Sequence, residues 1–176
     1  TCLDAGCGEG YYLRQLAATA AAEAHPLALA GLDISKWAVQ AAAKRDLHDA
    51  RSQAGPSPSP SPSTTWVVGS NAGLPVLPGT LDRVLCMFGF PVYAEFARVL
   101  RRGGELLQVD AGPDHLRELR EVIYPTLKPE RPAIRQTPPG FEHLATDTLR
   151  FPVHVDGAAP IADLLAMTPH LHRASA

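Results

Sequence analysis

The chain of 176 residues is long enough for one domain with a buried core, and its 45% hydrophobic and 19% charged residues are typical of a soluble globular protein. Its formal net charge of -2 does not predict polyanion binding through overall charge. Three scattered cysteines exclude a disulfide framework and a C-x-x-C zinc pair, and no apolar run reaches the roughly 20 residues that span a bilayer. We therefore expect a cytoplasmic protein with neither a metal site nor a membrane segment.

Apolar runs suited to buried strands alternate with helical segments along most of the chain. In chain order, the predicted elements are a strand at 1–3, a helix at 11–24, a strand at 27–32, a helix capped by Ser35 that ends at about 45, strands at 65–68 and 83–88, a helix at 93–100, a strand at 105–109 and an amphipathic helix at 113–124. This alternation predicts an α/β fold with a doubly wound, mostly parallel sheet, and such sheets bind ligands outside the carboxyl ends of their strands.

Two proline-rich segments interrupt the pattern. Residues 52–63 alternate proline with serine and cannot offset their ordering entropy by burial, so we expect an exposed, mobile insertion there. Prolines between 127 and 139 predict a loop over one edge of the sheet. We expect a single domain at 1–176, with its core at 2–124 and a substrate-side loop and partial C-terminal region at 125–176.

Three glycines on alternate positions, Gly6, Gly8 and Gly10, follow the first apolar stub and Asp4. Glycines at such a turn let a ligand approach the backbone, but a dinucleotide fingerprint would place its third glycine at Tyr11. The carboxylate of Asp4 would repel a pyrophosphate and suits a ligand with positive charge. Asp33, at the end of the second strand, is placed to accept hydrogen bonds from ribose hydroxyls. Together these features predict S-adenosylmethionine as the cofactor.

Four segments resemble the class I, S-adenosylmethionine-dependent methyltransferases. Residues 3–10 resemble their first motif, 69–75 the segment beside adenine, and 81–84 and 96–104 the fourth strand and the turn before the fifth. The family often has aspartate where this chain has Ser70. The resemblance implies a Rossmann-like fold and an enzyme. The cofactor-binding residues that we expect are Asp4, Gly6, Gly8, Gly10, Asp33, Ile34, Ser70 and Asn71. The alternatives are that Asp4 caps the turn and that Asp33 caps the following helix.

A narrower resemblance, carried by residues 8–12, 31–36, 41–45 and 112–116 together with 119, 123–124 and 167–169, is to the 23S ribosomal RNA (guanine-N1)-methyltransferases. Members of that family carry an N-terminal zinc-binding module and a C-terminal part that closes the sheet. Neither is present in this sequence, and it begins with Thr1. We therefore expect a catalytic domain truncated at both ends, with weakened affinity for RNA.

The acceptor site is predicted from residues that follow the fourth and fifth strands. A flipped guanine needs a stacking surface, for which Phe88, Phe90 and Pro91 are placed, and its N1 proton needs a base. Asp110 and His115 are the candidate bases, and of these His115 matches the narrower family pattern. The alternatives are that both phenylalanines pack in the core or a loop and that His115 lies on a solvated helix turn.

The predicted function is methyl transfer from S-adenosylmethionine to N1 of a guanine in 23S rRNA, with ribosomal RNA as the partner. A small-molecule methyltransferase of the quinone or natural-product kind is the first alternative, since the Leu-Pro...Leu-Asp and Ala-Arg-Val-Leu-Arg-Arg-Gly-Gly segments occur there as well. An inactive, truncated cofactor-binding module is the second. The methylated nucleotide and the oligomeric state stay open.

Overall fold

The computed structural model describes residues 1–25, 27–53, 64–124 and 137–167. The chain divides into two compact units, which we describe separately. The sheet unit comprises Thr1–Asp110 and Pro138–Glu142, and the helical unit comprises Ala111–Thr137 and His143–Ala176. Most of the predicted insertion, at 54–63, and much of the predicted proline-rich loop, at 127–136, lie outside the described residues.

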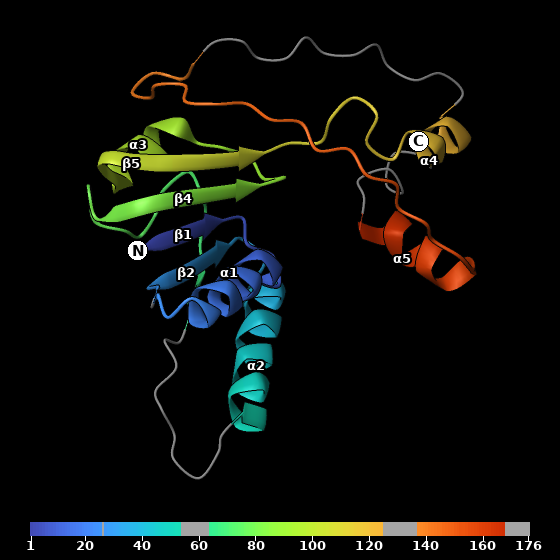
Figure 1. Ribbon diagram of the computed structural model, residues 1–176, viewed down its shortest axis with the longest axis horizontal. Coiled ribbons are helices and arrows are strands. Elements are labelled where there is room, and N and C mark those ends of the chain that lie inside the picture. The colour runs from blue at the N-terminus through green and yellow to red at the C-terminus, as the bar shows by residue number, and fades with distance from the viewer. Residues whose placement is uncertain (26, 54–63, 125–136, 168–176) are drawn as a thin grey trace. The chain divides into compact units, whose positions relative to one another are not determined.

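Strands and helices alternate through the sheet unit, as predicted. Its elements are β1 (Cys2–Ala5), α1 (Tyr11–Ala22), β2 (Leu29–Asp33), α2 (Lys36–Gln53), β3 (Thr65–Val68), β4 (Leu81–Met87), α3 (Tyr93–Val99) and β5 (Leu100–Val109). Every pairing between these strands is parallel, and the order across the sheet is β3-β2-β1-β4-β5 (Figure 1). The prediction of a Rossmann-like, doubly wound α/β fold is confirmed. In the helical unit the structure describes α4 (Arg117–Ile123) and α5 (Ala158–Met167).

Several element boundaries differ from the predictions. Helix α2 continues to Gln53 instead of ending near Arg45, because no proline or glycine interrupts the chain before Gly55. Strand β5 begins at Leu100, and the predicted turn at Gly103–Gly104 forms an irregularity in its pairing with β4. Helix α4 begins only after Leu116, whose left-handed φ of 48° interrupts the predicted helix, and α5 was not predicted.

Helices cover both faces of the sheet, so alternate strand residues enter two different core clusters. Leu3 and Ala5 of β1 face α3, where they pack in a cluster with Phe96 and Val99. Cys2 faces α1, in a cluster with Leu13 and Leu29. By the same alternation, Asp4 lies on the α1 face with no exposed surface. A charged side chain therefore stands in the apolar interior at the end of the first strand.

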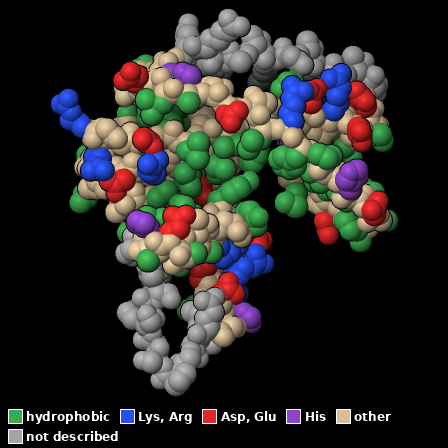
Figure 2. Space-filling view, viewed as in Figure 1, with side chains coloured by type: hydrophobic (Ala, Val, Ile, Leu, Met, Phe, Trp, Pro, Cys, Tyr) green, Lys and Arg blue, Asp and Glu red, His purple; other side chains and the backbone are tan. Residues whose placement is uncertain are grey.

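The order of the strands reverses between β1 and β4, which is where doubly wound sheets bind their ligands. The chain runs outward from β1 through β2 to β3 and then returns to the other side of β1, where it forms β4. On the face drawn in Figure 2, hydrophobic side chains gather around the carboxyl ends of the strands. Within the described residues no helix has both the length and the hydrophobicity to cross a bilayer.

Candidate cofactor and acceptor site

The bend from Gly6 to Gly10, which we call the glycine bend, connects β1 to α1 with left-handed backbone. Gly6, Gly8 and Gly10 have φ values of 98°, 53° and 76°, which residues with a Cβ rarely adopt. The amides of Gly6 and Cys7 both donate to the Leu32 carbonyl, at 2.8 and 3.0 Å. The backbone conformation therefore requires the three glycines, and the end of β2 holds the bend in place.

The glycines differ in what lies beside them. A Cβ on Gly8 would meet nothing within 4 Å, and one on Gly6 would approach only the Cα of Gly89, at 3.9 Å. A Cβ on Gly10 would stand 2.1 Å from Cη2 of Trp66. At Gly10 the space that a Cβ would take is filled by an indole of the protein itself, and the role of Gly10 in binding the cofactor stays a prediction. The bend is open to a ligand at Gly8.

Asp4 lies at the carboxyl end of β1 with its whole side chain buried. Neither carboxylate oxygen has a hydrogen-bond donor within reach among the described residues. Burial, and next the negative charge of Asp33, raise the pKa of Asp4 to about 6. The alternative that Asp4 caps the turn finds no support, because the bend's amides donate to other acceptors. A buried carboxylate without a donor is costly unless it is protonated or meets a positive charge.

Asp33 ends β2 and holds the bend through its side chain. One carboxylate oxygen accepts the Gly8 amide and the other accepts the Ser35 amide, each at 2.8 Å. Each oxygen keeps a second lone pair that a ribose hydroxyl could use. Ser35 caps α2 as predicted, since its Oγ accepts the Ala38 amide at 3.3 Å. The next residue along the chain from Asp33, Ile34, is 79% exposed and so presents an apolar surface beside this carboxylate.

Asn71, in the segment after β3, links the ends of two other strands. Its side-chain nitrogen donates to the carbonyls of Ala5, at 3.4 Å, and Phe90, at 3.1 Å, whereas its buried Oδ1 has no donor among the described residues. The neighbouring Ser70 uses its Oγ to accept the Ala72 amide. Asn71 thereby ties the start of the glycine bend to the loop after β4, a contact that its sequence position did not predict.

Two residues that the sequence analysis did not select hold this segment against α3. Arg98 donates to the carbonyls of Leu74 and Val76, at 2.9 and 2.8 Å, while Glu95 accepts the Leu74 amide. The hydrogen bonds from Arg98 and Leu74 lower the pKa of Glu95 to about 2. The sequence does contain a signal for this ion pair, because Glu95 and Arg98 are three residues apart on one helix.

The loop after β4 carries the predicted stacking residues. Phe88 has a left-handed φ of 56°, unusual for a residue with a side chain, and its amide donates to the Val109 carbonyl at 2.8 Å. Phe88 is half exposed and Phe90 is 88% exposed, so neither is the core residue of the alternative interpretation. Pro91 follows them and is partly buried. Backbone strain and exposed aromatic rings occur together here, beside the place where the strand order reverses between β1 and β4.

Asp110 directly follows β5 and belongs to the same sheet edge. Met87 of β4 pairs with Val109 of β5, so Phe88 and Asp110 follow neighbouring strand ends. The Gln108 amide nitrogen donates to Asp110 at 2.6 Å, and the Tyr93 hydroxyl donates to the Gln108 carbonyl oxygen at 2.9 Å. Neither Gln108 nor Tyr93 was predicted, because residues 15 positions apart give no local signal.

His115 lies in the helical unit, on an exposed turn before α4. Its backbone amide donates to the Gly112 carbonyl at 3.1 Å. Asp110 belongs to the sheet unit, so the two candidate bases fall in separately described parts of the chain. Asp110 and Phe88 thus lie at the same edge of the sheet. His115 belongs to the helical unit.

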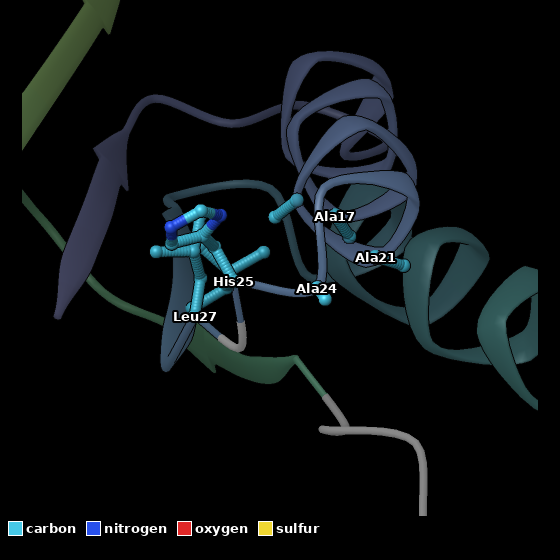
Figure 3. Close-up of a pocket in the computed structure, with 7 residues that line it drawn as sticks. Ala17, Ala21, Ala24, His25 and Leu27 are labelled. Carbon is cyan, nitrogen blue, oxygen red and sulfur yellow. The ribbon is translucent and has the colours of Figure 1, made fainter.

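A hollow elsewhere in the sheet unit does not suit the predicted cofactor. It lies between α1 and the start of β2 and is lined by Ala17, Ala21, Ala24, His25 and Leu27, among other residues (Figure 3). It offers apolar walls and no carboxylate, and it lies at the amino ends of the strands. No group of three or more histidine, cysteine, aspartate or glutamate side chains suited to a metal ion occurs among the described residues.

Comparisons with known proteins agree with this geometry. The model of a methyltransferase domain family matches residues 2–104. YxjB of Bacillus subtilis strain 168, which carries a provisional name as a 23S rRNA (guanine-N1)-methyltransferase, is 32% identical over 96% of this chain. The match covers 55% of YxjB, so the chain spans about half the length of that relative.

Solved structures share the fold at lower identity. The PH0226 protein of Pyrococcus horikoshii OT3 is 23% identical, with a TM-score of 0.51 over 69% of this chain and 51% of that protein. An S-adenosylmethionine-dependent methyltransferase of Methanosarcina mazei is also 23% identical, with a TM-score of 0.51 over 68% of this chain and 57% of that protein. At this level of identity the likeness concerns the arrangement of strands and helices.

Proposed function

Because this chain belongs to the family of S-adenosylmethionine-dependent methyltransferase domains, we propose that it transfers a methyl group to N1 of a guanine in 23S ribosomal RNA, acting in the cytoplasm. The observation that carries the methyl-transfer part is the buried, unpartnered carboxylate of Asp4 beside an open glycine bend. The guanine acceptor is supported by the identity to YxjB over nearly the whole chain.

The residues of the bend fit S-adenosylmethionine. When bound, this cofactor supplies a methyl group on a sulfonium ion, and it also carries an ammonium group. Asp4 is the one fully buried charged side chain among the described residues, and a nearby cation would compensate its charge. Gly6 and Gly8 leave room for the methionine end, Asp33 offers free lone pairs to the ribose, and Ile34, Ser70 and Asn71 would flank adenine.

The loop after β4 would receive the guanine. Methyl transfer requires the acceptor nitrogen in line behind the methyl group, so holding the base in place supplies most of the rate. A base inside an RNA helix must first be flipped out and stacked, for which Phe88 and Phe90 offer exposed rings and Pro91 an adjacent apolar edge. These three residues follow the strand next to β1, which carries the cofactor bend.

Asp110 is the candidate base that belongs to the sheet unit, as do the glycine bend and the loop after β4. Removal of the N1 proton requires an acceptor near the methylated edge of guanine. The hydrogen bond from Gln108, itself held by Tyr93, fixes one carboxylate oxygen of Asp110 and leaves the other to accept the proton. His115, in the helical unit, is the second candidate.

Methylation of isolated RNA tests the proposal. The full chain is incubated with methyl-labelled S-adenosylmethionine and either deproteinised 23S rRNA or a mixture of quinone precursors, and products are mapped by mass spectrometry. We expect 1-methylguanine at one position in the RNA. Label in the quinone fraction alone would identify a small-molecule enzyme. Label in neither fraction, from a chain that binds S-adenosylhomocysteine, would identify an inactive cofactor-binding module.

A further inference from the structure

The indole of Trp66 lies against the glycine bend, in space left by two glycines. Trp66 on β3 pairs in register with Gly31 on β2. A Cβ on Gly31 would stand 2.4 Å from Cζ3 of the indole, and a Cβ on Gly10 would stand 2.1 Å from Cη2. The ring therefore extends across β2 as far as the residue that caps α1. Two glycines from different parts of the chain thus accommodate a single ring.

One hydrogen bond fixes the orientation of this ring, and its acceptor is connected back to the bend. The indole nitrogen donates to Asp46 of α2 at 2.9 Å. The other carboxylate oxygen of Asp46 lies 3.9 Å from the Arg14 guanidinium of α1, and Arg14 donates to the Glu9 carbonyl in the bend at 2.6 Å. Contacts thus run continuously from β3 through α2 and α1 back to the bend.

We propose that Trp66 is a positioning residue of the cofactor site. The partly buried ring, held by Asp46 and in contact range of Gly10, prevents Gly10 from moving toward β3, and it thereby fixes the path of the bend at Gly8, two residues earlier. Small displacements of a binding backbone reduce affinity and rate strongly. The proposal rests on the cofactor part of the proposed function and is independent of the acceptor.

The two tryptophans of the chain allow a direct test of cofactor binding. Trp37 is exposed, so Trp37→Phe leaves Trp66 as the single fluorescent indole in an otherwise intact surface. We expect this variant to bind S-adenosylhomocysteine in calorimetric titration and to show a change in Trp66 emission on binding. A Trp37→Phe variant that folds but gives no binding heat would overturn both the cofactor assignment and this inference.

Substitution of Trp66 itself tests its positioning role. We expect Trp66→Phe to weaken S-adenosylhomocysteine binding by about tenfold. Phe96→Leu, in the cluster on the opposite face of the sheet, is the matched control: it also removes buried packing but should leave the affinity unchanged. Asp46→Asn retains an acceptor for the indole and should bind as the unaltered chain does, whereas Asp46→Ala should bind more weakly. A Trp66→Phe variant that loses thermal stability like Phe96→Leu, yet keeps its affinity to within about twofold, would overturn the proposal.

A double substitution isolates the contact between Gly10 and the indole. Gly10→Ala should weaken binding because its methyl group would overlap the ring and because its φ is left-handed. In a Trp66→Phe background the smaller ring leaves space for that methyl group, so the additional loss of affinity should be smaller. Losses that simply add in the double variant would show that the ring does not position Gly10 and would overturn the inference.

Discussion

The two halves of the sheet edge are built differently. On the proposed cofactor side, the bend after β1 is fixed by backbone hydrogen bonds to β2, by one carboxylate oxygen of Asp33 and by the indole of Trp66. On the proposed acceptor side, the loop after β4 presents exposed rings, and Asp110 after β5 accepts a hydrogen bond from Gln108, which in turn accepts one from Tyr93. The cofactor side is therefore determined by backbone and burial, and the acceptor side by side chains that face solvent.

If the two regions bind cofactor and acceptor as proposed, this difference explains why one can be shared among many enzymes while the other varies. A cofactor shared by many enzymes can be bound by backbone geometry, which tolerates little change. An acceptor is recognised by a few exposed side chains, which can change without loss of the fold. Substitutions on the acceptor side should therefore alter turnover or acceptor affinity and leave cofactor binding intact, and substitutions on the cofactor side should do the reverse.

The largest effect is expected for Asp110→Asn. If Asp110 removes the N1 proton, its loss should lower kcat by roughly 10²- to 10⁴-fold, because an amide cannot accept the proton. Affinity for S-adenosylhomocysteine should stay unchanged in calorimetry. The same measurements on His115→Ala test the second candidate base. A normal kcat for Asp110→Asn together with a large loss for His115→Ala would move the role of the base to the helical unit.

Asp4→Asn should stabilise the protein and, at the same time, weaken its binding of the cofactor. The folded-state pKa of about 6 lies above the ordinary value of 3.8, so the folded chain holds a proton that the unfolded chain has lost between about pH 4 and 6. Stability should fall as pH rises through that window and level off above it. Asp4→Asn should abolish this slope and stabilise the protein at pH 7 by up to about 3 kcal/mol, as urea unfolding would show.

The same substitution should weaken cofactor binding. Since S-adenosylmethionine carries positive charge, affinity should rise with pH through about 6 in the unaltered chain and stay level in Asp4→Asn. Asp163→Asn, an exposed change of the same charge in α5, is the control. An affinity that does not depend on pH in the unaltered chain would contradict a charged Asp4 as a partner of the cofactor.

A pair of glycine substitutions should give the next largest effect. Gly8 and Gly79 both have left-handed φ values, 53° and 67°, and open space where a Cβ would stand. Gly8→Ala and Gly79→Ala should each cost about 1 kcal/mol of stability through backbone strain. Gly8→Ala alone should weaken S-adenosylhomocysteine binding, because its methyl group would enter the ligand space. Equal affinities for the two variants would show that the cofactor does not approach Gly8.

The smallest effect on stability is expected for Phe90→Ala. Because the ring is 88% exposed, its removal should change the free energy of unfolding by less than about 0.5 kcal/mol. The KM for substrate RNA should rise by roughly 5- to 150-fold, which corresponds to the loss of one stacked base. Leu77→Ala, an exposed apolar residue elsewhere in the sheet unit, is the control and should alter neither quantity.

Most of the cofactor half could be predicted from sequence because its signals are local. A strand, three alternate glycines and a helix start lie within a few residues, and the turn imposes its own requirement for positive φ. Asp33 could be located because the next strand brings its end to the same sheet edge. Phe88 and Phe90, which we propose for the acceptor site, were selected by their place after β4, but their exposure and the strain at Phe88 were not predictable.

The sequence by itself determined the alternation of strands and helices, the glycine bend and the carboxylates at two strand ends, because periodicity and backbone preference act over short stretches of chain. Only the tertiary structure decided that Gly10 accommodates Trp66, that Asn71 joins two strand ends, and that Asp4 is buried without a donor. Each of these depends on parallel strands that bring residues far apart in the sequence into contact, and no local pattern encodes such contacts.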